Sequence, residues 1–579
     1  MADHAAPTPE MPVCIEARDY GFRYDAADEP QLRNLTFAIR QGERVAIMGA
    51  TGAGKTTLAM SLNGLVPHHH EGEVSGHLCI DGHDVAATTI TQLVRDVGLV
   101  MQDAEAQVTG RTVGEDAAVG PANLGLPKHE VLIRARAALE QVGMGGLERR
   151  ATSQLSGGQL QRLAIAGILA MKPRILVLDE PTSELDPAGA AQVLSVLHAL
   201  SDEPDGPTVI LVTHEPELVM EWASRLLVLG DGRLIYDGAP AAFFVDTDLV
   251  RRSGVRQPGV VSAVVALREA EAIAAIPLPV TMEEAVALLR PHRRAGEVVV
   301  APRDEPPVAP KNPPVLRTVA LSHRYPSGVV ALAGVSVDIH EGEFVALLGA
   351  NGAGKTTFAR HLNGLLRPTT GIVEVNGRAT AGRPVHELAA EVGYVFQNPD
   401  HQIFAASVFD EVAFGLRNRG VGEREIAERV QAVAHRVGLD GQLRTHPYRL
   451  GKGQRQRLAV ASVLATEPGM LVIDEPTTGQ DWSGSLATME LVQSLSDEGH
   501  TILMITHDMA LAARYARRAL VFDQGRIVAD RDMRALLGDG DLLHRARLAR
   551  PHVTELAVRL GLSPVGTPED FVVAWGAVG

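Results

Sequence analysis

The sequence predicts an α/β protein built from two similar halves. A glycine-rich loop, Gly49 to Thr56, stands between a strand-like apolar run and a helix-like run, and the same loop recurs from Gly349 to Thr356, 300 residues later (355 − 55 = 300). Each half also contains a four-residue apolar run followed by two acidic residues, and such a run is typical of a buried parallel strand. Segments with helical periodicity occur between these runs in both halves.

Length and composition indicate a globular, multi-domain chain. Its 579 residues exceed what one hydrophobic core commonly holds, and 45% hydrophobic and 21% charged residues are ordinary for a globular protein. The net charge of −16 argues against a basic nucleic-acid-binding surface. No apolar run approaches the about 18 residues of a membrane span, and we expect no secretion signal at the N-terminus. Cys14 and Cys79 indicate neither a disulfide framework nor a zinc site, so we expect a reducing cytoplasm.

The two glycine-rich loops predict two sites for a nucleoside triphosphate. In the pattern G-x-x-x-x-G-K-[ST], successive backbone N–H groups surround a phosphate, because glycine has no side chain to block the approach. The N-terminus of the following helix also favours the anion. The lysine would reach the β- and γ-phosphates, and the threonine would face Mg²⁺. The predicted nucleotide-binding residues are Gly49, Thr51, Gly52, Gly54, Lys55, Thr56 and Thr57 in the first half and Gly349, Asn351, Gly352, Gly354, Lys355, Thr356 and Thr357 in the second.

One tyrosine precedes each loop, Tyr24 in the first half and Tyr325 in the second. Either ring could stack on an adenine base, a contact worth about 1–3 kcal/mol. The alternative is a half-buried tyrosine of a strand. We expect the stacking role because the tyrosine recurs at nearly the same distance from both loops.

Three consecutive histidines, His68 to His70, follow the first loop and suggest a metal site by composition. Adjacent side chains of regular structure cannot all point at one ion, and Pro67 and Gly72 flank the run. We therefore expect a solvated loop here.

Acidic residues end the buried-strand runs, as Asp179 and Glu180 in the first half and Asp474 and Glu475 in the second. An acid at the carboxyl end of such a strand, beside a phosphate loop, usually holds Mg²⁺. A second acid can accept a proton from the attacking water. Strand-end glutamines, Gln102 and Gln397, are weaker candidates for the Mg²⁺ shell or for the attacking water.

Two further features recur. Strand-like runs end at His214 and His507; a lone histidine is more often a core residue, but the recurrence favours a γ-phosphate contact. A Ser-Gly-Gly-Gln run at a helix start provides a second anion cradle in the first half, formed by Ser156, Gly157, Gly158 and Gln159. Helical periodicity over 127–143 and 421–437 predicts a small helical subdomain in each half, with Val131, Leu132, Ala135, Leu139 and Val142 on one apolar stripe.

The ordered motifs resemble a tandem pair of ABC-transporter nucleotide-binding domains over nearly the whole chain. They comprise an aromatic A-loop, Walker A, Q-loop, signature, Walker B with glutamate, H-switch and a D-loop, which includes Glu184 and Gly479. The resemblance implies two P-loop NTPase domains, each with a RecA-like core, an antiparallel β subdomain, a helical subdomain and a small C-terminal extension. The implied boundaries are 12–245 and 315–535 for the domains, 246–297 and 536–579 for the extensions, and 298–314 for a stiff Pro-rich linker.

The resemblance also implies a head-to-tail pairing, in which each ATP lies between the Walker A loop of one half and the signature of the other. Glu180 and Glu475 would then polarise water, while His214 and His507 hold the γ-phosphate. The cofactors would be ATP and Mg²⁺, with the metal shells lined by Thr56, Gln102 and Asp179 and by Thr356, Gln397 and Asp474.

The second signature departs from the family pattern, because it consists of Gly451, Lys452, Gly453 and Gln454. The γ-phosphate opposite would lose a hydroxyl donor, and a hydrogen bond to a charged group is worth about 1.5–3 kcal/mol. The Lys452 ammonium could compensate partly as a point charge. By the head-to-tail rule this signature faces Lys55, so we expect an asymmetric ATPase in which the second Walker site carries most turnover.

The residues around Gln397 indicate a subfamily of ABC transporters. The sequences of residues 396–404 and 410–416 resemble those of energy-coupling-factor (ECF) importers of vitamins and cobalt. Residues 101–108 and 115–127 of the first half resemble the same family in a more divergent form. The similarity implies an ATP-hydrolysing subunit, one chain per complex, on the cytoplasmic face of a membrane, beside an integral coupling protein and a substrate-binding component. The solute would be a vitamin, a vitamin precursor or a transition-metal ion. The repeated tails, near Pro258 and Pro551, would help hold the halves together.

Two other classes of ABC protein fit the sequence less well. A soluble tandem ABC ATPase acting on ribosomes is disfavoured by the acidic charge and by the lack of a Lys/Arg-rich linker arm. A DNA-repair ATPase of ABC type would carry long coiled coils or zinc-binding cysteines, and we find neither pattern in the sequence.

Overall fold

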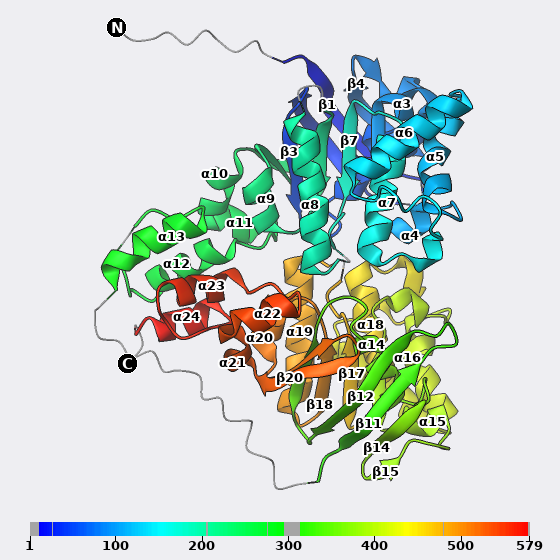
Figure 1. Ribbon diagram of the computed structural model, residues 1–579, viewed down its shortest axis with the longest axis vertical. Coiled ribbons are helices and arrows are strands. Elements are labelled where there is room, and N and C mark those ends of the chain that lie inside the picture. The colour runs from blue at the N-terminus through cyan, green and yellow to red at the C-terminus, as the bar shows by residue number, and fades with distance from the viewer. Residues whose placement is uncertain are drawn as a thin grey trace. The chain divides into compact units, whose positions relative to one another are not determined.

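The computed structural model describes residues 11–25, 27–183, 185–203, 206–274, 276–293, 313–478 and 480–576. The chain forms two compact units, Met1–Gln257 and Pro258–Gly579 (Figure 1). The predicted linker 298–314 lies outside the described residues except for Pro313 and Pro314, and Glu184 and Gly479 of the D-loops also lie outside them.

The first unit contains β1 (Val13–Tyr24), β2 (Leu32–Arg40), β3 (Arg44–Gly49), α1 (Lys55–Leu62), α2 (Leu65–His68), β4 (Gly72–Ile80), β5 (His83–Asp84), η1 (Val85–Ala87), α3 (Ile90–Asp96), β6 (Val97–Val100), α4 (Ala104–Gln107), α5 (Val113–Asn123), α6 (Lys128–Gln141), η2 (Thr152–Gln154), α7 (Gly157–Leu169), β7 (Ile175–Asp179), α8 (Pro187–Asp202), β8 (Thr208–Val212), α9 (Pro216–Trp222), β9 (Arg225–Gly230), β10 (Arg233–Gly238), α10 (Pro240–Val245) and α11 (Thr247–Ser253).

The second unit begins with α12 (Gly259–Glu269), α13 (Met282–Leu289) and η3 (Arg290–His292). It continues with β11 (Leu316–Arg324), β12 (Val330–Ile339), β13 (Phe344–Leu348), α14 (Lys355–Leu362), β14 (Thr370–Val375), β15 (Arg378–Ala379), α15 (Val385–Leu388), β16 (Val392–Val395), η4 (Pro399–His401), α16 (Val408–Asn418), α17 (Glu423–Arg436), η5 (Asp440–Gln442), η6 (Pro447–Arg449), α18 (Lys452–Leu464), β17 (Met470–Asp474), α19 (Trp482–Asp497), β18 (Thr501–Ile505), α20 (Met509–Tyr515), β19 (Arg518–Asp523), β20 (Arg526–Asp532), α21 (Met533–Gly538), α22 (Gly540–Arg545), α23 (His552–Arg559) and α24 (Pro568–Ala574).

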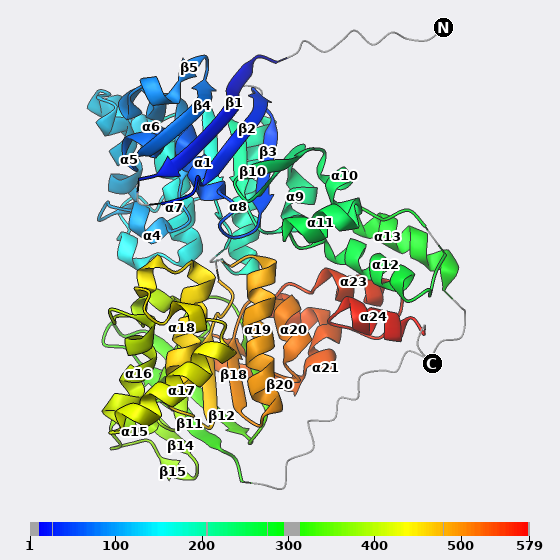
Figure 2. The same cartoon turned by 180° about the vertical axis from the view of Figure 1, so that it is seen from behind.

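Each unit contains two sheets of the same design. In the first unit an antiparallel sheet has the order β2-β1-β4-β5, and Figure 2 shows its strands β1, β2 and β4. The main sheet has the order β10-β9-β3-β8-β7-β6, in which β3, β8, β7, β6 and β9 pair in parallel and β10 is antiparallel. Every residue of β7 and β8 is buried, as expected for parallel strands covered on both faces.

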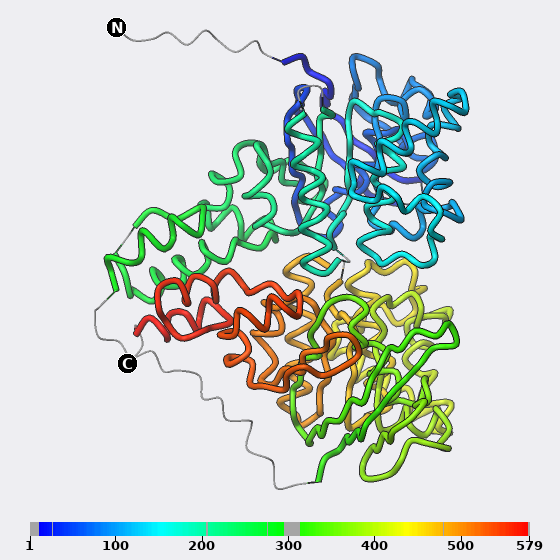
Figure 3. The backbone as a smooth tube through the Cα atoms, viewed as in Figure 1, coloured from blue at the N-terminus to red at the C-terminus, as the bar shows by residue number. Residues whose placement is uncertain are grey.

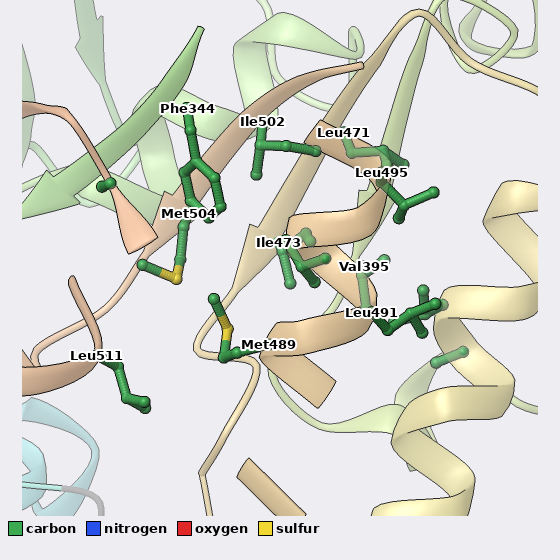
Figure 4. Close-up of a cluster of buried hydrophobic side chains, with 14 of the residues drawn as sticks. Phe344, Val395, Leu471, Ile473, Met489, Leu491, Leu495, Ile502, Met504 and Leu511 are labelled. Carbon is green, nitrogen blue, oxygen red and sulfur yellow. The ribbon is translucent and has the colours of Figure 1, made fainter. Parts of the chain in front are cut away.

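The second unit repeats this plan with the orders β12-β11-β14-β15 and β16-β17-β18-β13-β19-β20. Helix α19 covers one face of its main sheet, where Phe344 of β13 and Met504 of β18 pack with Met489 of α19 in one buried cluster (Figure 4). In both units the strand that leads into the glycine-rich loop, β3 or β13, is therefore central. The loops after it and after its neighbours gather at one edge of the sheet.

The helical subdomain of the first unit corrects one expectation. Val131, Ala135 and Leu139 of α6 are buried, as predicted, and Ala135 and Leu139 belong to a core cluster of the first unit. Leu132 does not: its side chain is 57% exposed. Each helical residue turns the chain by about 100°, so a residue next to Val131 points well away from the face that Val131, Ala135 and Leu139 share.

The helices that follow the first ATPase core do not all belong to the first unit. Helices α10 and α11 pack on β3 and β9 of the first unit. Helices α12 and α13 belong to the second unit, where Val264 and Leu267 pack with Leu556 and Phe571 of α23 and α24. The tube of Figure 3 shows green α12 and α13 beside red α23 and α24. The unit boundary, Gln257 to Pro258, thus falls inside the predicted extension 246–297.

Candidate functional site

Both glycine-rich loops have a backbone that requires glycine. Gly49 and Gly349 have φ of 146° and 141°, and a Cβ on either would lie 2.2 Å from a carbonyl oxygen of the neighbouring strand. Each lysine curls over its loop: Nζ of Lys55 donates to the carbonyl oxygens of Gly49 and Ala50 at 2.9 and 3.0 Å. Lys355 repeats these contacts at 2.7 and 3.0 Å. The ammonium groups therefore lie at the loops, where phosphates would bind.

The predicted aromatic residues lie beside the same loops. The hydroxyl of Tyr24 is 3.0 Å from Oγ1 of Thr57, and that of Tyr325 is 3.1 Å from Oγ1 of Thr357. Both tyrosines are half-buried. Each tyrosine hydroxyl thus contacts the first turn of the helix that follows its loop. The exposed part of each ring is accessible to an adenine base.

The acidic pairs lie where the strand pattern predicts. Asp179 is the last residue of β7 and Asp474 the last residue of β17, and burial raises the pKa of both carboxyl groups. Glu180 and Glu475 follow with φ of 51° and 47°. A non-glycine residue in this left-handed region costs about 1–3 kcal/mol, and such strain concentrates at functional sites.

Each glutamate meets the predicted histidine. Nε2 of His214 lies 3.3 Å from Oε1 of Glu180, and Nδ1 of His507 lies 3.0 Å from Oε2 of Glu475. The negative charge of Glu475 raises the pKa of His507 to about 9, although burial opposes this. Burial raises the pKa of Glu180 to about 8, with the charges of Asp179 and Glu215 adding to the effect and Lys55 opposing it. Both halves thus place a histidine ring nitrogen beside the glutamate, Nε2 in the first half and Nδ1 in the second.

The metal-ligand candidates fit a hard cation. Oδ1 of Asp179 is buried and has no hydrogen-bond partner among the described residues. In the second half the Thr356 hydroxyl donates to Oδ1 of Asp474 at 3.5 Å. Hydroxyl and carboxylate oxygens are ligands that Mg²⁺ accepts beside nucleotide phosphates. Gln102 and Gln397 lie in the loops two residues beyond β6 and β16, half-buried and exposed respectively.

The two signatures differ at the helix start. Ser156 caps α7: its Oγ accepts from the backbone N–H of Gln159 at 3.4 Å, and the Gln159 side chain accepts from the Ser156 N–H at 3.1 Å. Helix α18 has Gly451 at this position, and only the second contact is made, from the Gly451 N–H to Gln454 at 3.1 Å. Lys452 is the first residue of α18. The substitution therefore removes the serine hydroxyl and leaves the helix start in place.

Sequence reasoning missed two pairs that brace the loops between the core and the helical subdomain. Gln107 and Gln402 accept from the backbone N–H of Met101 and Phe396, next to the predicted glutamines. Asp116 accepts from two loop N–H groups at 2.8 Å, and Glu411 does the same at 3.0 and 2.8 Å. Both pairs are separated by the same 295 residues as Asp179 and Asp474 (474 − 179 = 295), and this recurrence could have identified them from the sequence.

The histidine run is exposed, but it is not wholly a loop as expected, because His68 is the last residue of α2 and only His69 and His70 follow the helix. His68, His69 and His70 are all exposed, and Nε2 of His68 lies 2.8 Å from the carbonyl oxygen of Val85. Within the described ranges, no group of three or more histidine, cysteine or acidic side chains is arranged to hold a metal ion. Cys14 and Cys79 are both free thiols.

Comparison with known proteins supplies the family. The sequence model described as ABC transporter matches residues 32–183 and 332–478, one match in each half. The chain belongs to the ABC transporter family. A putative ABC transporter ATP-binding protein of Caldanaerobacter subterraneus subsp. tengcongensis is 39% identical over 94% of this chain and 96% of its own length. One of Methanosarcina acetivorans is 39% identical over 97% and 92%.

Membership establishes two P-loop NTPase ABC domains and an ATPase that uses ATP with Mg²⁺. Transporter ATP-binding components of this family work with membrane subunits. Among the helices of the described residues, none has the length and apolar character needed to cross a bilayer. The solved structure of cbiO1 from Clostridium perfringens, titled as part of the ABC transporter complex cbiONQ, is 32% identical and covers 43% of this chain and 100% of its own, with a TM-score of 0.38.

Proposed function

We propose that this ABC ATPase energises the import of a small solute, a vitamin, vitamin precursor or transition-metal ion, as the ATP-hydrolysing subunit of an ECF-type transporter. It acts at the cytoplasmic face of a membrane beside a coupling protein and a substrate-binding component. Its second Walker site carries most of the turnover.

The stretch that resembles ECF importers is tied to the signature helix in the second unit. The Asn398 side chain accepts from the backbone N–H of Asp400 at 3.0 Å. The Asp400 carboxylate forms an ion pair with Arg455 of α18 at 2.7 Å. Arg455 directly follows Gln454 of the signature. A partner that moves this stretch would therefore move the start of α18, which is what coupling of transport to ATP hydrolysis requires.

An exposed aromatic group beside this stretch carries the proposal of a membrane partner. Phe404 is 62% exposed and Phe414 is 46% exposed, and their rings meet edge to face with centroids 4.7 Å apart. The exposed Tyr448 joins them, with its hydroxyl 3.3 Å from the carbonyl oxygen of Ile403. Exposed aromatic side chains that gather on one surface mark interaction sites for apolar partners. The apolar face of an amphipathic helix of a membrane subunit has this chemistry.

Three observations support unequal turnover. By the head-to-tail pairing that the resemblance implies, the second Walker site meets Ser156 of the first signature, and the first Walker site meets Gly451. Burial raises the pKa of Glu180 and so disfavours the charged carboxylate that would accept a proton from water. The raised pKa of His507 favours its cationic form, and Nδ1 of this imidazole lies 3.0 Å from Oε2 of Glu475.

Affinity purification from detergent-solubilised membranes tests the transporter role. We expect integral-membrane proteins to co-purify with the tagged chain, and ATP-dependent solute uptake after reconstitution of the assembly. Phe404→Ala with Phe414→Ala is expected to lose these partners, whereas Val573→Ala, which truncates an exposed valine of α24, retains them. Recovery of ribosomal proteins and RNA in place of membrane proteins would favour the alternative, a soluble tandem ABC ATPase acting on ribosomes.

A further inference from the structure

The second half contains a contact at its metal-ligand candidate that the first half lacks. In the second half the Tyr394 hydroxyl donates to Oδ2 of Asp474 at 2.8 Å, and both residues are buried. Tyr394 lies in β16, which pairs with β17, the strand that Asp474 ends. Leu99 occupies the corresponding position in β6, next to β7 and Asp179. The two aspartates are therefore held differently.

The hydrogen bond constrains how the Asp474 carboxylate can turn. The terminal torsion of an aspartate is broad, so a free carboxylate samples many orientations. A phenol hydroxyl that donates to a carboxylate forms a short, charge-assisted bond, which fixes Oδ2 on the side of β16. Oδ1 is then left on the side of Thr356, whose hydroxyl lies 3.5 Å away. In the first half Thr56 also forms a hydrogen bond with the Asp179 carboxylate, but Leu99 provides no hydroxyl from β6, and Oδ1 of Asp179 has no partner among the described residues.

We propose that Tyr394 is a positioning residue for the metal site: it orients the Asp474 carboxylate to receive Mg²⁺, so that the second Walker site holds the metal more tightly than the first. This inference rests on the assignment of Thr356 and Asp474 to Mg²⁺ with bound nucleotide. Groups that hydrogen-bond to metal ligands orient them, and their loss typically lowers metal affinity about 10- to 100-fold.

The alternative explanation is that the hydrogen bond between Tyr394 and Asp474 has no role in metal binding. Asp474 would then serve only as the acceptor that a buried tyrosine hydroxyl usually requires. Under that explanation Tyr394→Phe changes stability and leaves metal affinity alone. Under the proposal it lowers metal affinity even in a chain that is fully folded. The two explanations therefore differ in a binding measurement that needs no turnover.

The test measures how much Mn²⁺, a stand-in for Mg²⁺, tightens the binding of the ATP analogue AMP-PNP to the purified full chain. Titration calorimetry with Mn²⁺ and with EDTA gives this tightening factor. Lys55→Ala restricts the measurement to the second Walker site, and Lys355→Ala restricts it to the first. In the Lys55→Ala background, Tyr394→Phe is expected to reduce the tightening about tenfold or more, toward the value of the first site. Tyr515→Phe, which removes a tyrosine hydroxyl from α20, is the matched control and is expected to leave it unchanged.

The proposal would be overturned if Mn²⁺ tightened AMP-PNP binding in the Tyr394→Phe variant by a factor within twofold of that in the Lys55→Ala chain. Should that variant fail to fold, Tyr394→Leu reproduces the residue that the first half carries in the same strand, and the same outcomes apply. Absence of any Mn²⁺ effect in the Lys55→Ala chain itself would overturn the assignment of the metal site, and this inference with it. No membrane partner takes part, so failure of the proposed transport role would leave the result interpretable.

Discussion

Repair of the second signature is the most informative single perturbation of the proposed asymmetry. Gly451 has φ −63° and ψ 158°, close to the φ −76° and ψ 161° of Ser156, so a serine can adopt this backbone without strain. A Cβ on Gly451 would meet Oε1 of Gln454 at 3.8 Å, an ordinary contact. Gly451→Ser with Lys452→Gly should therefore fold, and the new N-cap hydroxyl changes stability by only a few tenths of a kcal/mol.

The expected effect on turnover is much larger than the effect on stability. A hydroxyl that donates to a charged phosphate is worth about 1.5–3 kcal/mol, and each 1.36 kcal/mol in the barrier is about a tenfold change in rate. If the new donor acts in the transition state, the first Walker site should accelerate about 10- to 100-fold. Steady-state ATP hydrolysis by the assembled complex measures this in a Glu475→Gln background, where the second site is silent.

Two controls make the repair decisive. Gly451→Ala adds the Cβ without the hydroxyl and should leave the rate of the first site where it was. Ser156→Gly, in a Glu180→Gln background, should slow the second site by a factor similar to the gain. The role assigned to the hydroxyl would be refuted if the repaired signature did not accelerate ATP hydrolysis at the first Walker site. It would also be refuted if Gly451→Ala raised that rate as much as the serine does.

Three further predictions concern stability and nucleotide binding. Phe571→Ala removes a fully buried ring from the cluster that α12, α13, α23 and α24 share, and should lower the free energy of unfolding of that cluster by about 3–5 kcal/mol, measured by denaturant titration, with nucleotide affinity unchanged. Tyr325→Ala should weaken ATP binding at the second site by about 1–3 kcal/mol, whereas Tyr325→Phe, which keeps the ring, should not; equal loss from both would exclude stacking. Glu475 raises the pKa of His507 from 6.5 to about 9, so the pair's contribution to stability is complete below pH 6.5 and is lost as the pH rises through 9. The stability lost in His507→Gln should accordingly be larger at about pH 6 than at about pH 9.5, and a loss independent of pH would contradict the charged pair.

Much of the fold and of the candidate site could be predicted because the chain repeats itself. A residue such as Asp179 or His214 carries little information alone, but its recurrence beside a second phosphate loop separates chemistry from packing. The strand ends then bring these residues together, since neighbouring parallel strands finish at one edge of the sheet.

What the sequence could not predict depends on contacts between distant segments or between single residues. Tyr394 meets Asp474 across 80 residues, and Leu99 in the other half removes the repetition that would have exposed the contact. The apolar faces of α12 and α13 predict burial, but not that α23 and α24 of the other half would cover them. The expectation for Leu132 was wrong because the edge of a buried helix face cannot be read from apolar residue type alone, and Leu132 lies about 100° around α6 from Val131.

Comparison of Glu475→Gln with Glu180→Gln tests the central claim most directly. Each variant removes one carboxylate that would accept a proton from water and keeps the shape of the side chain, so ATP hydrolysis by the assembled complex reports the share of each site. The account predicts that Glu475→Gln abolishes most of the activity, a loss of about 100-fold or more, and that Glu180→Gln leaves most of it. Equal losses from the two variants would contradict the asymmetry.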